Sequence, residues 1–493
     1  MGYRTRRRVL FGAGCTALAI ALAVPAAAIP IPSLPPPLLT PTFVGAPATA
    51  NPIASTPVPQ NPYLAPNGRN NIHDDAYATD AYSGPGPLGR KPVVTSELYG
   101  VEECATVAFD NAGRIVGLCG NLSGPVLRLI DPVTLKVLAT HSLPGRQFKV
   151  GVNPLSDLCG GAYFYLDNLD RAVVETTART IEVVADAGNA LTLQRTYDLT
   201  SAVPSDDCLI ALAPDWNGLI WFESQDGIIG TVNPDTGAVH TTTLTGEVIA
   251  NSFAVDETGG VFIVSDHAMY RFDADPVSGM PVVSWRQAYD RGSTTKTGQL
   301  SQGSGTTPTL FGDGLVAITD NADPRMDVVV YRRGRESGGQ FVCQAPVFAP
   351  GASATENSLV AVGNSLYAEN NYGYKDPTST LLGATTTPGI ARVDVTPSGQ
   401  CVNVWTSSEI APTSVPKASL ASGLLYVYTK PKSLLVDAWY FTAIDLRTGA
   451  TVYSKLTGLG PEWNNHYAAI YLGPDGSAYI ATLTGMVRIR DTA

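Results

Sequence analysis

The stretch Ala443-Ile444-Asp445-Leu446-Arg447-Thr448-Gly449-Ala450-Thr451-Val452-Tyr453 contains two short apolar runs separated by a turn. Asp445 is suited to start the turn and Gly449 to take a positive φ, so we predict a strand, a tight turn and a returning strand. Related turns recur at Asp131 to Thr134, Asn233 to Gly237 and Asp394 to Gly399. The chain is therefore predicted to repeat one small antiparallel unit.

A second kind of turn precedes these in the clearer units, as in Asp110-Asn-Ala-Gly113, Asp215-Trp-Asn-Gly218 and Asp256-Glu-Thr-Gly259. Each unit then holds two hairpins, or four strands, and the units recur about every 52 residues. A period of this length built from four-stranded units predicts an all-β fold, a β-propeller with eight blades. Seven blades is the alternative, because the second unit, around Tyr163 to Asn189, is degenerate.

The last unit is short of one strand. Tyr479-Ile480 and Met486 to Arg490 supply its second and third strands, and its fourth is missing. An open edge is avoided in β proteins. We predict that a spare strand, Pro92 to Leu98, completes the last blade and closes the ring.

The unit Ala443 to Tyr453 resembles the A-x-D-x-x-T-G-x-x-x-W repeat of pyrroloquinoline-quinone-type (quinoprotein) propellers, with Tyr453 in place of Trp. Asn233 to Gly237 is a partial match. This resemblance implies the propeller fold. The vicinal cysteine pair of quinoprotein alcohol dehydrogenases is absent, so a quinone cofactor (PQQ) is not expected. The same repeat family includes non-catalytic scaffold propellers, and the fold alone does not decide function.

The N-terminal region divides by composition. Arg4 to Arg8 form a basic head, the apolar run Val9 to Val24 follows, and Ala26 to Ala28 fit a cleavage site, as in a secretory signal peptide. The segment Thr5 to Leu10 resembles a twin-arginine export signal. We therefore predict four regions: a signal peptide (1–28), a linker with 12 prolines (29–66), an ordered polar arm (67–91) and the propeller (92–493).

Charge and hydropathy limit the partners. The chain has 43 acidic against 32 basic residues, and four of the basic ones belong to the predicted signal peptide. Such a surface repels nucleic acid and anionic lipid. After the signal peptide, no apolar run reaches the roughly 18 residues of a membrane span. We expect a monomeric protein that is secreted, extracellular or associated with the cell wall.

Six cysteines remain outside the predicted signal peptide, and an even number in an exported chain favours disulfides. Cys104 and Cys119 are equidistant from the Asn111-Ala112 turn, so they should face each other across one hairpin. The other cysteines occupy matched positions in successive units. We predict the pairs Cys104–Cys119, Cys159–Cys208 and Cys343–Cys401.

Candidate site residues follow from the geometry of a propeller, in which loops entering first strands and leaving second strands share one face around the axis. We call this face the mouth, and ligands are expected there. Polar side chains gather in these loops, and the candidates for ligand binding are Asp320, Asp323, Glu356, Asn357, Glu369, Asn370, His267, Asn465 and His466.

Carboxylate and amide oxygens are the ligands that Ca²⁺ prefers, so Asp320, Glu356 and Glu369 are the candidate calcium ligands. The same carboxylates, if they shared a funnel of low dielectric, would raise one another's pKa and suit general acid or base work. The structural alternative is that Asp and Asn side chains in these loops only satisfy loop backbone groups.

The arm and the longest loops add further candidates. His73 and Asp74 would join the site if the arm covered the mouth; otherwise they form a solvated polar turn. Tyr372, Tyr374 and Trp439 lie in the longest predicted mouth loops, where aromatic side chains suit stacking on a sugar ring or pin the loops in place.

The sequence thus favours an exported β-propeller that binds a small-molecule or saccharide-like (glycan) ligand at its axial mouth, with Ca²⁺ as the candidate metal. Two alternatives stay open: a metal-dependent hydrolase or lactonase, and a non-catalytic scaffold of the cell envelope. The sequence contains no G-x-S-x-G, Walker or H-E-x-x-H motif. Whether the protein is an enzyme is not decided by these patterns.

Overall fold

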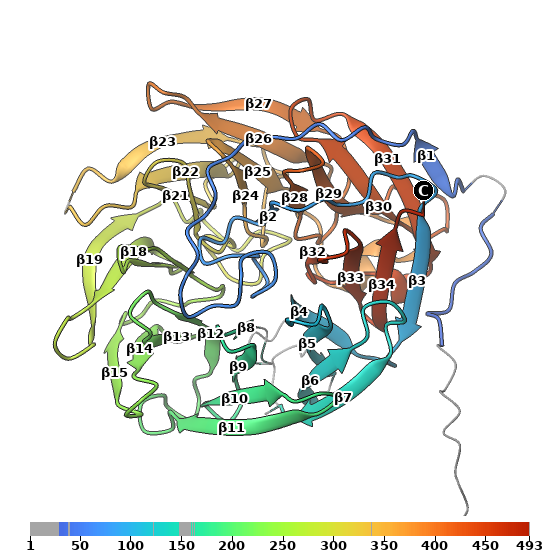
Figure 1. The fold of residues 1–493 in the computed structure, drawn as a ribbon. Helices are drawn as coiled ribbons and strands as arrows, with labels where there is room; N and C mark the ends of the chain where they lie inside the picture. The colour runs from blue at the N-terminus through green and yellow to red at the C-terminus, as the bar shows by residue number, and fades with distance from the viewer. Residues whose placement is uncertain are drawn as a thin grey trace, which may run out of the picture.

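The computed structural model describes residues 29–37, 40–121, 123–146, 159, 161, 163–336 and 338–492. It is a β-propeller in which eight antiparallel sheets stand around a common axis (Figure 1). This confirms the predicted all-β class and the count of eight blades. The predicted signal peptide (1–28) lies outside the described residues. In the described part of the chain, no helix is long and apolar enough to cross a membrane.

The first four blades follow the chain without a crossover, and each is a four-stranded sheet. Their strands are, in blade 1, β4 (Glu103–Phe109), β5 (Ile115–Asn121), β6 (Gly124–Ile130) and β7 (Val137–Ser142); in blade 2, β8 (Phe164–Leu166), β9 (Arg171–Glu175), β10 (Thr180–Asp186) and β11 (Leu191–Asp198); in blade 3, β12 (Leu209–Pro214), β13 (Ile220–Ser224), β14 (Ile228–Val232) and β15 (Val239–Thr243); and in blade 4, β16 (Ala254–Val255), β17 (Val261–Val264), β18 (Ala268–Ala274) and β19 (Pro281–Ala288).

The other four blades complete the ring, together with the 3₁₀ helices η3 (Pro377–Gly383) and η4 (Pro461–Trp463). Their strands are, in blade 5, β20 (Thr309–Phe311), β21 (Leu315–Thr319), β22 (Asp327–Arg332) and β23 (Phe341–Pro346); in blade 6, β24 (Val360–Val362), β25 (Ser365–Glu369), β26 (Ile390–Val395) and β27 (Cys401–Ser407); in blade 7, β28 (Lys417–Ser419), β29 (Leu424–Thr429), β30 (Ala438–Asp445) and β31 (Thr451–Leu459); and in blade 8, β32 (Ile470–Leu472), β33 (Ala478–Thr482), β34 (Gly485–Arg490) and β3 (Val93–Leu98).

The hairpin turns form for the reason that the sequence suggested. In the first turn of blade 1, the Asp110 carboxylate accepts hydrogen bonds from the backbone N–H groups of Ala112 and Arg114. In the last turn of blade 7, Asp445 accepts from the N–H groups of Arg447 and Thr448. Each turn therefore satisfies its own backbone locally, and all these turns lie on one face, which we call the turn face.

The ring closes as predicted, because β3 pairs antiparallel with β34 from Val93↔Arg490 to Leu98↔Gly485. The strand that comes before blade 1 in the chain is thus the outer strand of blade 8. This pairing covers the edge that β34 would otherwise expose.

The proline-rich segment is extended, but it is attached to the propeller and does not act as a free spacer. β1 (Phe43–Gly45) pairs with β31 and widens the sheet of blade 7, and Ile31 is buried. Farther along, the N–H groups of Asn51 and Ile53 donate to carbonyls of blade 7. Composition predicts an extended backbone, whereas its attachment depends on an outer strand edge that offers hydrogen-bonding partners.

The arm (67–91) crosses the turn face over the axis (Figure 1). Backbone N–H groups at the turn-face ends of five first strands donate to its carbonyls, and β2 (Ala81–Tyr82) pairs in parallel with β28. These donors and acceptors are Phe109 to Arg69, Leu166 to Asn70, Val255 to Ala76, Leu310 to Tyr77 and Ala361 to Thr79. The arm thus closes the end of the axis opposite the mouth.

All three predicted disulfides are present. Cys104 faces Cys119 across the β4–β5 hairpin. The pairs Cys159–Cys208 and Cys343–Cys401 link successive blades.

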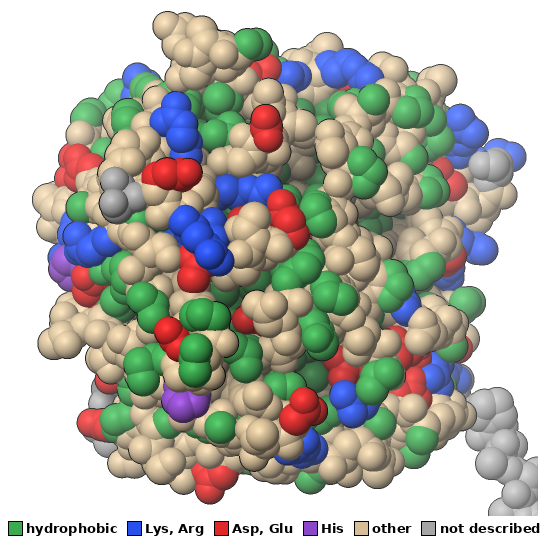
Figure 2. All heavy atoms as spheres, turned by 60° about the vertical axis from the view of Figure 1, so that its left-hand side comes forward, with side chains coloured by type: hydrophobic (Ala, Val, Ile, Leu, Met, Phe, Trp, Pro, Cys, Tyr) green, Lys and Arg blue, Asp and Glu red, His purple; other side chains and the backbone are tan. Residues whose placement is uncertain are grey.

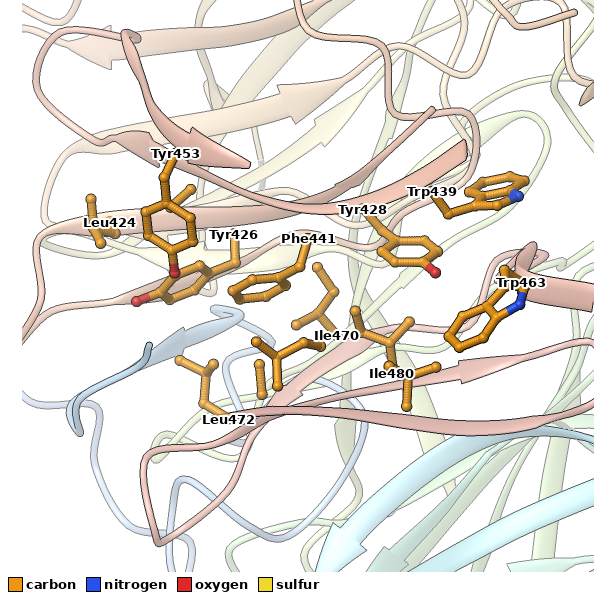
Figure 3. Close-up of a cluster of buried hydrophobic side chains, with 14 of the residues drawn as sticks. Leu424, Tyr426, Tyr428, Trp439, Phe441, Tyr453, Trp463, Ile470, Leu472 and Ile480 are labelled. Carbon is orange, nitrogen blue, oxygen red and sulfur yellow. The ribbon is translucent and has the colours of Figure 1, made fainter. Parts of the chain in front are cut away.

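The hydrophobic core lies between neighbouring blades, and blade 7 packs stacked aromatic rings against aliphatic side chains of blade 8 (Figure 3). Tyr426 stacks on Phe441 with ring centroids 5.0 Å apart, and Tyr428 stacks on Trp439 at 5.5 Å. Trp439 belongs to β30 and is fully buried, so its prediction as a mouth-loop residue is wrong. Its strand begins earlier than the polar sequence before it suggested.

Candidate functional site

The axis of the ring contains a hollow of about 140 Å³, which we call the axial cavity. All eight blades contribute to its wall, because their first strands surround the axis. The arm contributes Ile72 and His73 from the turn face, and mouth loops contribute Leu300 and Tyr467. The remaining lining residues are Glu103, Ala105, Tyr163, Ile210, Ala250, Asn251, Thr307, Glu356, Asn357, Ser358, Val415, His466 and Ala468.

Glu356 is the most unusual group in the axial cavity. It is 7% exposed, and neither carboxyl oxygen has a hydrogen-bond partner among the described residues. Burial raises its pKa to about 8, although the nearby N–H of Leu300 moderates the rise without reaching hydrogen-bond geometry. Buried polar groups without a partner are rare in proteins, and such a group indicates a position where a water, ion or ligand can bind.

Other polar groups around Glu356 are also incompletely paired. In the part of the chain that the structure describes, the Asn251 amide nitrogen lacks an acceptor, and both carboxyl oxygens of the buried Glu223 lack a donor. Burial raises the pKa of Glu103, and burial and the charge of Glu175 raise that of Glu223. The Tyr163 hydroxyl has a raised pKa because it is buried and lies near Glu356 and Glu223.

His73 reaches the axial cavity from the arm. Its Nε2 lies 3.0 Å from the Ser252 hydroxyl, and its Nδ1 lies 3.2 Å from Asp80. Asp80 also forms a fully buried ion pair with Lys417. Burial alone would raise the pKa of Asp80, but the charges of Lys417 and His73 outweigh it and lower the pKa. The arm is therefore anchored by charge at the point where it closes the axis.

The arm covers the turn face, so His73 joins the cavity from the end opposite the mouth. Asp74 does not join it, and lines instead a groove between the arm and the proline-rich segment. Burial and then the charge of Asp75 raise the pKa of Asp74. His73 and Asp74 are thus neither mouth residues nor a solvated turn.

Several predicted site residues are tied into the loops. Glu369 accepts hydrogen bonds from Asn357, Asn371 and the N–H of Ser414. Asn370 bridges the backbone of its own loop and the loop before β24, and Asn465 bonds Thr413 and the Ala468 carbonyl. For Glu369, Asn370 and Asn465 the structure shows the loop-satisfying alternative.

A second hollow, of about 610 Å³, opens on the mouth side between blades 4 and 5, and we call it the rim cleft. Asp320 and Asp323 line it together with Asp290 and Asp327 and the aromatic rings of Tyr289, Tyr331 and Phe341. Burial raises the pKa of Asp320 to about 7, and the charges of Asp327 and Asp290 add to the rise. Asp323 accepts from the Ser293 hydroxyl at 2.7 Å, which with its other hydrogen bonds lowers its pKa.

The predicted calcium ligands are not gathered at one point. Asp320 lines the rim cleft, Glu356 lines the axial cavity and Glu369 lines neither. Across the described ranges, no group of three or more His, Cys, Asp or Glu side chains is arranged to hold a metal ion. The calcium prediction gains no support from this arrangement.

The remaining candidates lie in mouth loops. His267 contacts Asp266 at 2.7 Å and accepts from Arg291, outside both hollows. His466 lines the axial cavity and hydrogen-bonds to the buried Tyr374 hydroxyl at 3.0 Å. Tyr372 lies beside Asn370, whose side chain holds its N–H. Of the long-loop aromatics, Tyr374 thus supports His466.

The sequence analysis does not predict Glu103, Tyr163 and Glu223 as site residues. Glu103 begins β4 next to Cys104, Tyr163 belongs to the degenerate second unit, and Glu223 lies inside the buried strand β13. A charged residue in an otherwise apolar strand, as in Ile220-Trp-Phe-Glu223, is the signal that could have found Glu223.

Comparison with known proteins agrees with the fold. No model of a known protein family matches this chain. A protein of Archaeoglobus fulgidus, described as uncharacterized, is 28% identical over 369 residues, which is 67% of this chain and 70% of that protein.

Among solved structures, quinohemoprotein alcohol dehydrogenase from Comamonas testosteroni has a TM-score of 0.54 at 11% identity, covering 87% of this chain and 82% of that chain. Streptogramin B lyase has a TM-score of 0.41 at 11% identity, covering 81% and 97%. The first likeness confirms the fold-level resemblance to quinoprotein propellers, and at this identity it shows the fold alone.

Proposed function

We propose that this propeller binds a small polar molecule in the axial cavity. The observation that carries the proposal is Glu356, a buried carboxyl group that faces the cavity without a hydrogen-bond partner in the described chain. Leaving such a group unpaired costs about 1–3 kcal/mol or more, and a ligand that donates to it recovers this free energy. Residues from all eight blades line the cavity into which Glu356 faces.

The size of the axial cavity limits the ligand. A cavity of roughly 150 Å³ holds a molecule the size of benzene. The axial cavity, at about 140 Å³, therefore suits a ligand of about six heavy atoms rather than a whole saccharide. It is also smaller than three fused rings, so we assign no PQQ to it, and the absence of PQQ stays a prediction.

A second candidate function is binding of a saccharide-like ligand in the rim cleft. Its volume of about 610 Å³ lies within the range typical of small-molecule sites. Aromatic rings beside carboxylates suit the faces and hydroxyl groups of a sugar, and here the exposed ring of Phe341 lines the same cleft as Asp320. An Asp320 pKa of about 7 also suits general acid or base work, which keeps a hydrolase as the enzymatic form of this candidate.

The remaining parts of the sequence hypothesis are proposals of the same kind. Export is supported by the three disulfides, since such bonds persist in oxidising surroundings. Calcium binding stays a prediction. A scaffold role would be favoured by a large apolar patch, but the flank shown in Figure 2 mixes both charge signs with scattered hydrophobic groups.

The test fills the axial cavity without removing a polar group. Ala105→Leu places three more carbon atoms in the cavity wall. A screen of polar compounds of up to about eight heavy atoms, read by ligand-observed NMR, is expected to give binders of the wild type that Ala105→Leu loses.

The same screen includes methyl glucoside, whose binding should be lost in Asp320→Asn if the rim cleft is the site. Binders that survive Ala105→Leu unchanged, or no binders in a broad screen, would overturn the axial proposal. Near-ultraviolet circular dichroism checks that both variants keep the native packing.

A further inference from the structure

The axial cavity is electrically one-sided. Its lining includes the carboxyl groups of Glu103 and Glu356, and in the described structure no lysine or arginine contributes to the wall. Glu223 lies buried nearby, close enough for its charge to act, as that of Glu356 does, on the Tyr163 hydroxyl. The Asp80 charge is already offset by Lys417. Burial shifts these carboxyl groups toward their neutral form, and a positive charge inside the cavity would stabilise their ionised form.

The unpaired hydrogen-bonding groups in the cavity require both donors and an acceptor from a ligand. Glu356 offers two acceptor oxygens, while the Asn251 amide nitrogen, on a residue 8% exposed, is a donor for which the described residues supply no acceptor. Both residues line the same small space. A ligand that satisfied both would need hydrogen-bond donors at one end and a neutral acceptor at the other.

These observations rest on the proposed axial binding function and sharpen it. We infer that the axial ligand is a small primary ammonium compound that also carries a neutral hydrogen-bond acceptor, such as a hydroxyl or carbonyl oxygen. The ammonium group donates to Glu356, and the acceptor receives the Asn251 amide. A carboxylate-bearing ligand is disfavoured because it would bring a negative charge into a buried space that is lined by acidic side chains and, among the described residues, by no lysine or arginine.

The experiment compares four probes of nearly equal size by isothermal titration calorimetry. Ethanolamine has both an ammonium group and an acceptor, propylamine has only the ammonium group, ethylene glycol has no charge, and glycolate has the opposite charge. We expect ethanolamine to bind at least tenfold more tightly than ethylene glycol, glycolate not to bind, and propylamine to be intermediate.

Two variants assign the contacts. Glu356→Gln keeps the shape of the side chain and should weaken ethanolamine at least tenfold while leaving ethylene glycol nearly unchanged. Asn251→Ala should reduce the preference for ethanolamine over propylamine. The matched control is Asp313→Asn, which removes one carboxylate at an exposed turn on the turn face and should alter none of these values.

The outcomes separate this inference from the proposed function. If ethylene glycol or glycolate binds as tightly as ethanolamine and Ala105→Leu abolishes that binding, the cavity is a binding site and the ammonium inference is wrong. If calcium chloride binds with dependence on Glu356 while ethanolamine does not, the cation is a metal and the inference is again wrong. If no probe binds and Ala105→Leu changes nothing, both proposals fail.

Discussion

The aromatic core between blades 7 and 8 and the axial cavity are both buried, but they differ in whether their polar atoms have hydrogen-bond partners. In the core, the hydroxyl groups of Tyr426 and Tyr453 donate to the Pro87 carbonyl at 2.9 and 2.7 Å. The Tyr428 hydroxyl meets that of Thr457 at 2.7 Å. At the axis, Glu356 and Glu223 find no such partner in the described chain.

This difference separates a structural interior from a candidate binding site. The polar groups of a stable core exchange hydrogen bonds to water for hydrogen bonds to protein, because a buried group without a partner loses the free energy of its hydration. The core of blades 7 and 8 meets that condition, and the axis does not. Groups that remain unpaired in an otherwise satisfied structure are the places where a ligand has the most to contribute.

The largest expected effect lies on the core side of the comparison. Phe441→Ala removes a fully buried ring that stacks on Tyr426, and it should lower the free energy of unfolding by roughly 3–5 kcal/mol. Urea denaturation followed by tryptophan fluorescence measures the change. The matched control is Phe341→Ala, where the ring is 49% exposed. Equal losses for the two variants would mean that the stacked cluster is not the stabilising core.

The second prediction concerns pH and the axis. The pKa of Glu356 is about 8 in the folded protein and near the ordinary value of 4.5 when unfolded, so the folded state binds its proton more tightly. Its contribution to stability is therefore complete below about pH 4.5 and is lost as pH rises to about 8, by up to about 1.4 kcal/mol per pH unit. Glu356→Gln removes this dependence.

The measurement is the difference in unfolding free energy between Glu356→Gln and the wild type from pH 4.5 to 8. It should grow in favour of the variant across this window and then level off. The other titratable groups at the cavity, Glu103, Tyr163, His73 and His466, are common to both proteins. A difference that stays flat with pH would show that Glu356 is paired after all.

The smallest effects come from single polar atoms. Tyr428→Phe removes the bond to Thr457 and should cost about 1 kcal/mol. Glu223→Gln, made at the axis, should change stability by less than about 0.5 kcal/mol near pH 6 and stabilise the protein at higher pH, because burial favours the neutral form of this side chain. A larger loss for Glu223→Gln than for Tyr428→Phe would reverse the comparison.

Local chemistry made most of the fold predictable. Turns such as Asp110 to Gly113 satisfy their backbone within a few residues, so sequence alone locates them. The count of such turns predicts eight blades, and the spare strand Pro92 to Leu98 is predicted to close the ring because the last unit lacks a strand. The sequence predicts Trp439 in a loop because the residues before β30 lack a strand pattern, whereas in the structure Trp439 belongs to β30 and packs on Tyr428.

The site was predictable only in part. Loop position correctly placed Glu356, Asn357 and His466 around the axis, but the same rule put Asp320 with them, whereas it lines the rim cleft. The sequence leaves His73 either in a site covered by the arm or in a solvated polar turn, whereas in the structure His73 lines the axial cavity from the turn face. Glu103 and Glu223 lie within strands, whereas the sequence prediction considers only residues in the mouth loops and the arm.

By itself, the sequence determined the repeating hairpins, the ring of eight blades, its closure and the pairing of six cysteines, because each depends on residues near in sequence or on the regular spacing of units. Only the tertiary structure decided which polar side chains converge, how the arm closes the axis and which carboxyl groups remain unpaired. Those outcomes depend on the path of loops across different blades and on the removal of water. Neither the loop paths nor the removal of water produces a periodic pattern in the sequence.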